Sequence, residues 1–254
     1  MDREKQVSHD ASWERRRHIF LTLMTDQLVE VCCESAGAAL APGKRMILSP
    51  RWRSPLSLAI KRGLDVVVSA ILLLLLSPVL LLVAIAVKVR SAGPVFYRWK
   101  VVGRGGRPFT GYKFRSMVAN ADALRDGLAA RNEMTGPVFK IANDPRITKV
   151  GAWLRKYSLD ELPQLYSVLV GDMSLVGPRP PLVTEFEQFN DYQKQKLSVK
   201  PGITCLWQVS GRNQISDFDE WVRLDLEYIC RWSLGLDLAI LMRTVETVFS
   251  GSGK

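Results

Sequence analysis

The stretch Arg155–Pro181, RKYSLDELPQLYSVLVGDMSLVGPRPP, decides how the rest of the chain is interpreted. Two adjacent carboxylates, Asp160 and Glu161, stand just ahead of apolar residues that recur at the spacing of a one-faced helix, namely Leu162, Leu165, Tyr166 and Leu169. The spacing of Ser158 and Glu161 is that of a capping box and predicts a helix start at Ser158. Pro163 is best tolerated in a first turn and favours a start near Asp160 instead. Both alternatives place Asp160 at a helix N-terminus, where backbone N–H groups favour anions.

The stretch closes with a turn, Gly177-Pro178-Arg179-Pro180, that the prolines stiffen and that presents one guanidinium group. A carboxylate pair, a helix end and an arginine turn are the parts expected of a phosphate-binding site. Adjacent Asp and Glu at a helix start are more often caps than catalytic groups. Side chains at i and i+1 also diverge by roughly 100° on a helix, so the pair does not resemble the facing carboxyl groups of a glycosidase. The pair therefore indicates catalysis only if the rest of the chain supplies a polyanionic substrate.

The charge of the chain points to an anionic partner. The 254 residues carry a net charge of +10, and it is unevenly distributed: residues 1–115 hold 19 basic and 8 acidic side chains, whereas the remainder holds 16 and 17. A basic excess favours nucleic acid, anionic lipid or a phosphorylated substrate. Because an apolar run lies inside the basic region and no nucleic-acid-binding motif is present, lipid is favoured and no nucleic acid is expected.

The scarcity of histidine and the spacing of cysteine exclude several kinds of catalytic site. The two histidines, His9 and His18, both lie near the N-terminus, which excludes an H-E-x-x-H metalloprotease and disfavours Ser-His-Asp or Cys-His machinery. The four cysteines form no C-x-x-C motif, so we expect reduced thiols rather than disulfides or structural zinc. Any catalytic group in the body of the chain must therefore be a carboxylate, lysine, tyrosine, serine or cysteine.

An apolar segment divides the chain into three predicted regions. Residues 1–57 form a basic N-terminal arm, for which an amphipathic surface helix and a poorly ordered tail are both open. Residues 66–87 are uncharged and long enough, at about 33 Å as a helix, to span a bilayer. Ser77-Pro78 lies at their midpoint, where the proline removes a helical hydrogen bond and allows a bend. Cationic residues flank both ends, and positive charge resists translocation. We therefore favour a re-entrant helix-break-helix over residues 58–90 rather than a single spanning helix.

Residues 91–254 predict a small, mostly helical cytosolic domain, so that the fold class is α+β and membrane-associated. Alternating apolar residues around 95–101, followed by a glycine-rich turn, predict a β-hairpin that carries Lys113 on its second strand. We expect a surface helix over 119–132 and a polar helix over 183–197. Two helices broken near Gly235 follow, and their apolar residues suit core packing or an interfacial position. Arg212 lies beside a glycine turn, where a guanidinium can meet a phosphate.

The motifs together resemble the bacterial sugar transferases, the monotopic polyprenyl-phosphate phosphoglycosyl transferases. The resemblance covers about residues 58–249. It is to the short form of the family, which lacks the four-helix N-terminal membrane module of larger members. It rests on motifs in a fixed order: KRGLD from Lys61, the Ser77-Pro78 break, YKFRSM from Tyr112, NDPRIT from Asn143, RKYSLDELPQL, GDMSLVGPRP, KPGIT and SGRN. Cys205 departs from the common pattern after PGIT, and the ending GSGK departs from it as well.

The resemblance implies transfer of a sugar-1-phosphate from a UDP-sugar to polyprenyl (undecaprenyl) phosphate in membrane-linked glycan assembly. By resemblance, Asp160 is the nucleophile, which forms an aspartyl phospho-sugar, and Glu161 holds Mg²⁺. Three arginines match family positions associated with the phosphates, namely Arg155, Arg179 and Arg212, and Lys113 is a further candidate. The resemblance also implies the inner face of the bacterial cytoplasmic membrane as the location, with membrane lipid as a partner.

One alternative function remains open at this stage, namely a non-catalytic membrane-bound scaffold of polysaccharide assembly. A second copy of the chain is a further candidate partner. The choice of sugar depends on pocket shape, which segments far apart in the chain form together.

Overall fold

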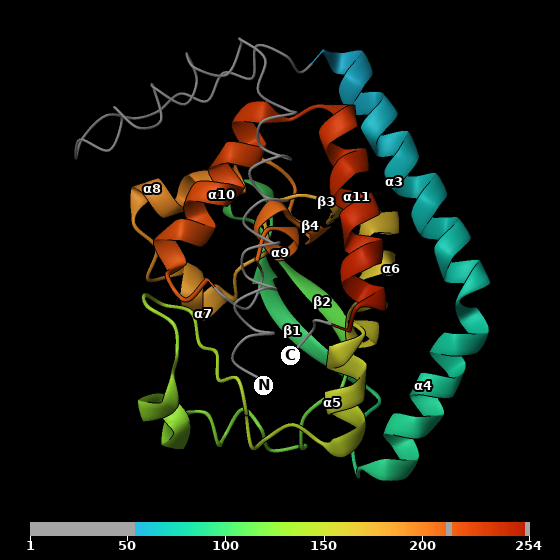
Figure 1. Ribbon diagram of the computed structural model, residues 1–254, viewed down its shortest axis with the longest axis vertical. Coiled ribbons are helices and arrows are strands. Elements are labelled where there is room, and N and C mark those ends of the chain that lie inside the picture. Colours follow the sequence, from blue (N-terminus) through green and yellow to red (C-terminus); the bar gives the residue numbers. More distant parts are fainter. Residues whose placement is uncertain (1–53, 212–214, 252–254) are drawn as a thin grey trace, which may run out of the picture. The chain divides into compact units, whose positions relative to one another are not determined.

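The computed structural model describes residues 54–211 and 215–251 (Figure 1). All of these belong to the second of two compact units, Trp52–Lys254, and the first unit is Met1–Arg51. Most of the predicted N-terminal arm and the candidate Arg212 therefore lie outside the described residues.

The apolar segment forms two helices with a bend of 61° between them, α3 (Pro55–Leu75) and α4 (Ser77–Arg90). The break has the predicted cause. Pro78 has no N–H to offer the Leu74 carbonyl, and the Ser77 hydroxyl donates to that carbonyl instead, at 2.8 Å. Within the described ranges no single helix is long and apolar enough to cross a membrane, whereas α3 and α4 pass that test of length and composition together.

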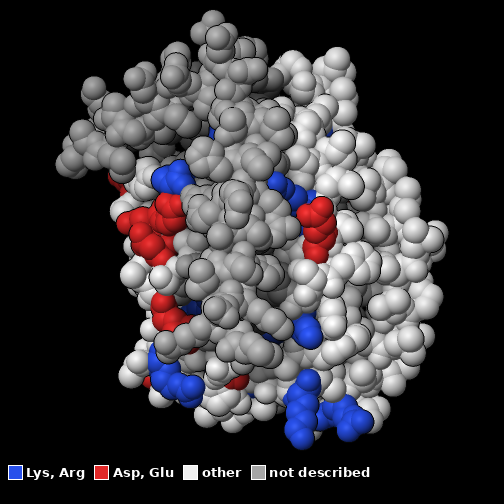
Figure 2. Space-filling model, in the orientation of Figure 1, with Lys and Arg blue, Asp and Glu red and all other residues white. Residues whose placement is uncertain are grey.

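The outer face of this bent pair is apolar and exposed. Leu74 is 75% exposed, Leu82 67% and Val89 74%, and the side chains of all three are entirely apolar. In Figure 2 the right-hand edge, where Figure 1 places α3 and α4, is almost free of charged residues. An apolar surface of this size on a folded chain indicates a binding partner or an apolar phase.

The predicted β-hairpin is present. Strands β1 (Phe96–Val102) and β2 (Pro108–Phe114) pair antiparallel through a 3-10 turn, η1 (Arg104–Gly106). Trp99 lies opposite Gly111, and a Cβ atom at Gly111 would be 2.3 Å from the indole nitrogen of Trp99. Only glycine therefore lets the indole ring lie flat across the hairpin.

The prediction of a surface helix over 119–132 is wrong, because the segment forms turns and one short 3-10 helix, η2 (Asp126–Arg131). Gly127 disfavours a longer helix, and the Asn132 side chain bonds the following loop at Met134, Val138 and Lys140. A regular helix, α5 (Lys149–Lys156), begins only after Thr148, whose hydroxyl accepts from Gly151 N at 2.9 Å.

The central stretch begins with a 3-10 turn, η3 (Leu159–Glu161), and the α-helix α6 (Gln164–Val170) follows it. The capping box predicted at Ser158 is not formed, because Ser158 has a φ of 54° and its side chain makes no capping hydrogen bond. A helix start near Asp160 is also wrong for the α-helix, which has Pro163 at its N-cap. Pro163 has no N–H to donate to the Leu159 carbonyl, which accepts from Leu162 N in the 3-10 turn instead, so the regular α-helix begins beyond Pro163.

Strand β3 (Ser174–Val176) follows and pairs in parallel with β4 (Gly202–Thr204). The single helix predicted over 183–197 is wrong: the structure has α7 (Val183–Phe186), α8 (Asp191–Lys194) and the 3-10 helix η4 (Gln195–Ser198). Asn190 starts a new helix, since its side chain accepts from Gln193 N at 2.9 Å.

Three helices complete the domain, α9 (Leu206–Val209), α10 (Phe218–Arg231) and α11 (Leu234–Phe249). The break between α10 and α11 is at Trp232-Ser233, where the Ser233 hydroxyl accepts from Leu236 N, and Gly235 lies inside α11. Most apolar residues of this region are in the core, but Leu238, Met242, Val245 and Phe249 form an exposed stripe along α11.

Polar side chains of α3 join the bent pair to the rest of the domain. Arg62 donates to the carbonyls of Val168 and Leu169 at the end of α6, at 2.6 and 2.8 Å. Asp65 is buried and accepts from Ser174 Oγ and Leu175 N on β3, at 3.0 and 2.9 Å. The KRGLD motif therefore anchors α3 to the core of an α+β fold.

The second helix of the pair is joined by apolar packing. Val83 and Val87 of α4 form a buried cluster with Phe114 of β2 and Leu154 of α5. After α4, the Arg115 guanidinium donates to the carbonyls of Ser91 and Ala92 and to the Ser91 hydroxyl, at 2.7 to 2.9 Å. The helix α4 is thus held by the elements that carry Lys113 and Arg155, whereas α3 is held by α6 and β3, which lie between Glu161 and Arg179 in the chain.

Candidate active site

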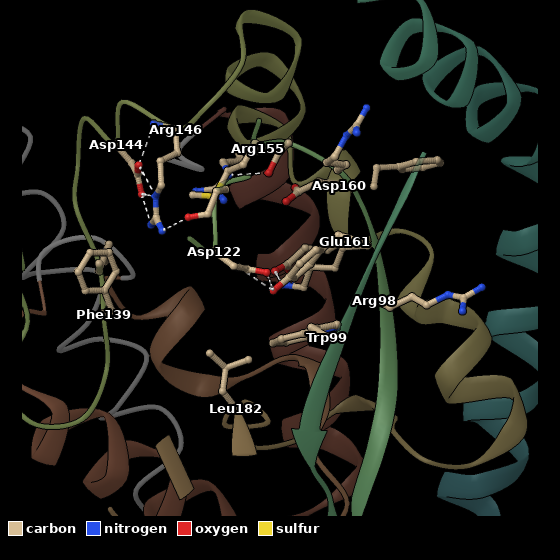
Figure 3. A pocket seen from close by; sticks show the side chains of 18 of the residues that line it. Arg98, Trp99, Asp122, Phe139, Asp144, Arg146, Arg155, Asp160, Glu161 and Leu182 are labelled. Atoms are coloured by element: carbon tan, nitrogen blue, oxygen red, sulfur yellow. Dashed lines mark hydrogen bonds and ion pairs between the residues drawn. The ribbon is translucent and has the colours of Figure 1, made fainter. Parts of the chain in front are cut away.

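One cavity of about 770 Å³ contains the candidate residues that the structure describes (Figure 3). Its lining includes Lys113 of β2, Arg155 of α5, Asp160 and Glu161 of η3, and Arg179 of the turn after β3. These residues come from four elements and were predicted together. Arg212 lies outside the described residues, so its prediction stays untested.

Asp160 is the most enclosed carboxylate in this group, with 8% of its surface exposed. Burial raises the pKa of Asp160, and the neighbouring Glu161 carboxylate raises it further; Lys113 and Arg155 act in the opposite direction. The buried carboxyl is thus balanced between cations and an anion, an arrangement that is more common at active sites than on ordinary surfaces.

Lys113 pairs with Glu161 rather than with Asp160. Its ammonium lies 2.8 Å from Glu161 Oε1 and 4.1 Å from the centroid of the Trp99 ring. Burial lowers the pKa of Lys113, and the Glu161 carboxylate opposes that effect. The ring of Trp99 therefore supports a cation on one side while Glu161 neutralises it on the other.

Arg155 is oriented by Ser116, because its Nε donates to the Ser116 hydroxyl at 2.9 Å. The Ser116 carbonyl in turn accepts from Thr148 N at 3.0 Å. Gly151 packs so closely here that a Cβ atom on it would lie 1.8 Å from the Ser116 oxygen. In Figure 3 the Arg155 side chain lies beside Asp160 and above Glu161.

Arg179 is half-buried and reaches the cavity from a turn with a fixed backbone. Gly177 N donates to the Thr204 carbonyl, and Gly202 N donates to the Pro178 carbonyl, both at 3.0 Å. Because strands β3 and β4 hold both sides of the turn, the position of Arg179 follows from their pairing.

The NDPRIT motif contributes a buried ion pair to the cavity wall. Arg146 and Asp144 of the NDPRIT motif lie 2.6 Å apart, both buried, and Arg146 also donates to the Ala121 carbonyl at 3.1 Å. The Phe139 ring lies between Arg125 and Arg146, with centroid distances of 5.3 and 5.2 Å. This pair fixes the loop that closes the wall.

Sequence reasoning missed Trp99 and Ser116 as supports of the site. Trp99 could be found by counting the β-hairpin register outward from the glycine turn, since it falls opposite Gly111. Ser116 stands inside the YKFRSM motif, but nothing in its local pattern indicates a contact with Arg155, which is 39 residues away.

The two carboxylates of the site fit one particular mode of metal binding. Within the described ranges no group of three or more His, Cys, Asp or Glu side chains is placed to hold a metal. Mg²⁺ is commonly held by one or two carboxylates together with substrate phosphates and water. The donor set of Asp160 and Glu161 fits that mode and not an all-protein cage.

Fold and site together define an α+β protein with a cation-lined cavity around a buried carboxylate, and comparison with known proteins gives the class. The chain belongs to the bacterial sugar transferase family, whose model matches residues 56–251. This is a family of transferase enzymes, which confirms the resemblance seen in the motifs.

Three relatives show the range of the similarity. The chain is 50% identical over 193 residues to "Galactosyl transferase CpsE" of Streptococcus agalactiae, with 76% of this chain and 43% of that protein covered. It is 46% identical over 198 residues to "Undecaprenyl-phosphate galactose phosphotransferase" of Salmonella typhimurium, with 76% and 41% covered. It is 41% identical over 197 residues to "Exopolysaccharide production protein ExoY" of Rhizobium meliloti, with 76% and 87% covered. The chain thus spans less than half the length of the first two relatives and most of the third.

Proposed function

We propose that this protein transfers a sugar-1-phosphate from a UDP-sugar to polyprenyl phosphate through a covalent phospho-sugar on Asp160. The observation that carries the proposal is the enclosed Asp160 carboxylate on the wall of a 770 Å³ cavity, with Lys113, Arg155 and Arg179 around it. The names of relatives in Salmonella and Klebsiella, which specify undecaprenyl phosphate with galactose or glucose, support the same donor and acceptor classes.

In the first step an Asp160 oxygen attacks the phosphorus nearer the sugar. A bond from that oxygen to phosphorus forms, the bond from phosphorus to the bridging oxygen of the diphosphate breaks, and UMP leaves with the electron pair. The attack brings an anion to a polyanion, so it needs positive charge nearby. Arg155 and Arg179 provide planar guanidinium groups suited to phosphate oxygens.

In the second step an oxygen of the lipid phosphate attacks the same phosphorus. The acyl phosphate bond then breaks, and Asp160 is regenerated as a carboxylate while the product carries a diphosphate between lipid and sugar. Two steps with moderate barriers thus replace one difficult direct transfer between two anions. Lys113, together with an Mg²⁺ ion held by Glu161, would neutralise the Glu161 carboxylate, so that Asp160 does not face a second uncompensated anion during either step.

Mg²⁺ belongs to the proposal because the donor set fits an ion shared with a diphosphate, with Glu161 as the protein ligand. When bound, the ion would offset the charge of the diphosphate and of the leaving UMP. The residues of the chain would hold and orient the rest of the substrate.

A membrane location is the second part of the proposal. The exposed apolar face of α3 and α4 and the apolar stripe along α11 are suited to a bilayer surface, with α3 and α4 as a re-entrant pair in one leaflet. The lipid phosphate lies at the headgroup plane, and a UDP-sugar arrives from water, so the cavity must open between the two. We propose the cytosolic face of the bacterial inner membrane.

The test is release of UMP from a panel of UDP-sugars by the purified protein, with and without undecaprenyl phosphate and Mg²⁺. The proposal expects release that depends on the acceptor for turnover, and its loss in Asp160→Asn. No release with any donor, together with membrane binding that survives Asp160→Asn, would favour a scaffold of polysaccharide assembly instead.

A further inference from the structure

Lys61 of the KRGLD motif makes contacts next to the site that the proposed chemistry does not use. Lys61 of α3 donates to Asp237 Oδ2 of α11 at 2.6 Å and to the Val176 carbonyl of β3 at 3.1 Å. Val176 is the last residue of β3, and the turn that carries Arg179 begins directly after it. An ammonium group of the apolar helix pair therefore contacts the start of the Arg179 turn.

Two more hydrogen-bond donors contact the acceptors of Lys61. Tyr228 OH donates to Asp237 Oδ1 at 2.8 Å and to the Val176 carbonyl at 3.1 Å, and Trp232 Nε1 donates to Asp237 Oδ2 at 3.1 Å. Asp237 and Tyr228 are buried. Removal of an ion pair from water is costly, so such a pair is weak evidence for stability and better evidence for a fixed arrangement.

On its other side the turn is held by backbone hydrogen bonds to β4, and the buried Asp225 carboxylate of α10 interacts with the Arg179 backbone N–H. Gly177 N donates to Thr204 and Gly202 N to the Pro178 carbonyl of the turn, as described above. Lys61 ties the bent helix pair to the last residue before the turn, whereas Asp65 of the same helix bonds Ser174 and Leu175 further back along β3.

We propose that Lys61 and Asp237 are positioning residues for Arg179, and that they couple the seating of α3 against the domain to the placement of the Arg179 guanidinium. The inference rests on the proposed function in one respect, the role of Arg179 as a phosphate-binding group. A displacement of about 1 Å at a group that binds the reacting phosphate can cost about 100-fold in rate.

Arg62 supplies a matched control, because it is the next residue of α3 and also makes two hydrogen bonds to backbone carbonyls. Those carbonyls, of Val168 and Leu169, belong to the end of α6 rather than to the Arg179 turn. Lys61→Met and Arg62→Met therefore each remove one cation and two contacts that anchor α3, but only the first acts on the turn.

The experiment measures UMP release and thermal unfolding for the full-length protein in lipid nanodiscs. We expect Lys61→Met to lower kcat/KM by roughly 10- to 100-fold, Lys61→Arg to recover much of it, and Arg62→Met to change it less than 3-fold at a comparable loss of thermal stability. Equal losses for the two methionine variants would overturn the inference.

A double-variant cycle tests the route through Arg179. In an Arg179→Lys background, where a cation remains and activity stays measurable, Lys61→Met should cost far less than it does in the wild type, since the guanidinium it positions is gone. Strictly multiplicative losses would overturn the coupling even if Lys61→Met alone were impaired.

Failure of the proposed function would be distinguishable from failure of this inference. If Arg179→Lys is as active as the wild type, the role of Arg179 itself is wrong. If Arg179→Lys is impaired but Lys61→Met matches Arg62→Met, only the positioning inference is wrong. Should Lys61→Met fold poorly, Asp237→Asn, which keeps the shape of the side chain, replaces it in the same comparison.

Discussion

The Lys113 ammonium lies 2.8 Å from Glu161 and is not the direct partner of Asp160, the residue immediately before Glu161. Its charge nevertheless lowers the pKa of Asp160, against the combined effects of burial and of Glu161. Lys113 and Glu161 therefore have opposite effects on the pKa of the proposed nucleophile, and these effects can be tested directly.

Replacement of Lys113 by methionine should move the acid limb of the pH–rate profile to higher pH. The substitution removes a cation that favours ionised Asp160 and leaves Glu161 without its partner, so the pKa of Asp160 rises further. We expect a loss of about 100-fold in kcat/KM at neutral pH, in the range seen when one charged group that stabilises a transition state is removed. The measurement is UMP release between pH 5 and 9. Lys113→Arg, which keeps the charge, should leave the limb in place, and an unshifted limb in Lys113→Met would contradict the charge balance.

The Asp160→Asn variant should be more stable than the wild type at high pH. Burial raises the pKa of Asp160 in the folded protein, so this carboxyl lowers the stability as pH rises from its unfolded pKa through its folded pKa, and it has no such effect below both. Asparagine cannot ionise. In detergent, the thermal unfolding midpoint of the variant should be higher than that of the wild type at pH 8 and equal to it near pH 4. Asp172→Asn at an exposed position is the control, and a variant less stable than wild type at pH 8 would refute the stated direction.

Gly151→Ala should disturb Arg155 through Ser116. The added Cβ atom would lie 1.8 Å from the Ser116 carbonyl oxygen, so either the strand end or α5 must shift. We expect a stability loss of about 1–3 kcal/mol, as is usual for overpacking, with a larger relative loss of activity. Gly127→Ala is the control, because nothing lies within 4 Å of a Cβ atom there. Normal activity in Gly151→Ala would show that Ser116 does not set the position of Arg155.

Pro78→Leu should straighten α3 and α4 and change how the pair sits in a bilayer. Leucine restores an N–H for the Leu74 carbonyl, which the Ser77 hydroxyl now satisfies. Single cysteines at Leu56 and Val89, both exposed, report the two ends in a background without native cysteines. We expect labelling of both from one side of proteoliposomes for the parent and from opposite sides for Pro78→Leu. Opposite-side labelling of the parent would rule out the re-entrant arrangement.

Local chemistry predicted several elements correctly. Pro78 and its missing N–H indicated the break between α3 and α4, and alternation with a glycine turn indicated β1 and β2. The motifs indicated Lys113, Arg155, Asp160, Glu161 and Arg179 as one site; all five line one cavity, and their roles stay a prediction.

One failure has a local cause, and the others concern features that depend on tertiary contacts. The segment 183–197 has a polar helical composition, but Asn190 interrupts it and Phe189 packs against Phe218 from another element, with ring centroids 5.1 Å apart. Pairing of Lys113 with Glu161, and of Lys61 with Asp237, joins residues 48 and 176 positions apart. Spacing along a chain carries no information about such pairs.

The central claim is that an oxygen of Asp160 becomes bonded to phosphorus. The most direct measurement is mass spectrometry of the protein after brief incubation with a UDP-sugar and Mg²⁺ in the absence of polyprenyl phosphate, followed by acid quench and peptide mapping. The account predicts a sugar-phosphate adduct on the peptide that contains Asp160, which disappears on addition of the lipid acceptor and is absent in Asp160→Asn. An adduct on a different residue, or acceptor-dependent turnover by Asp160→Asn at the wild-type rate, would contradict it.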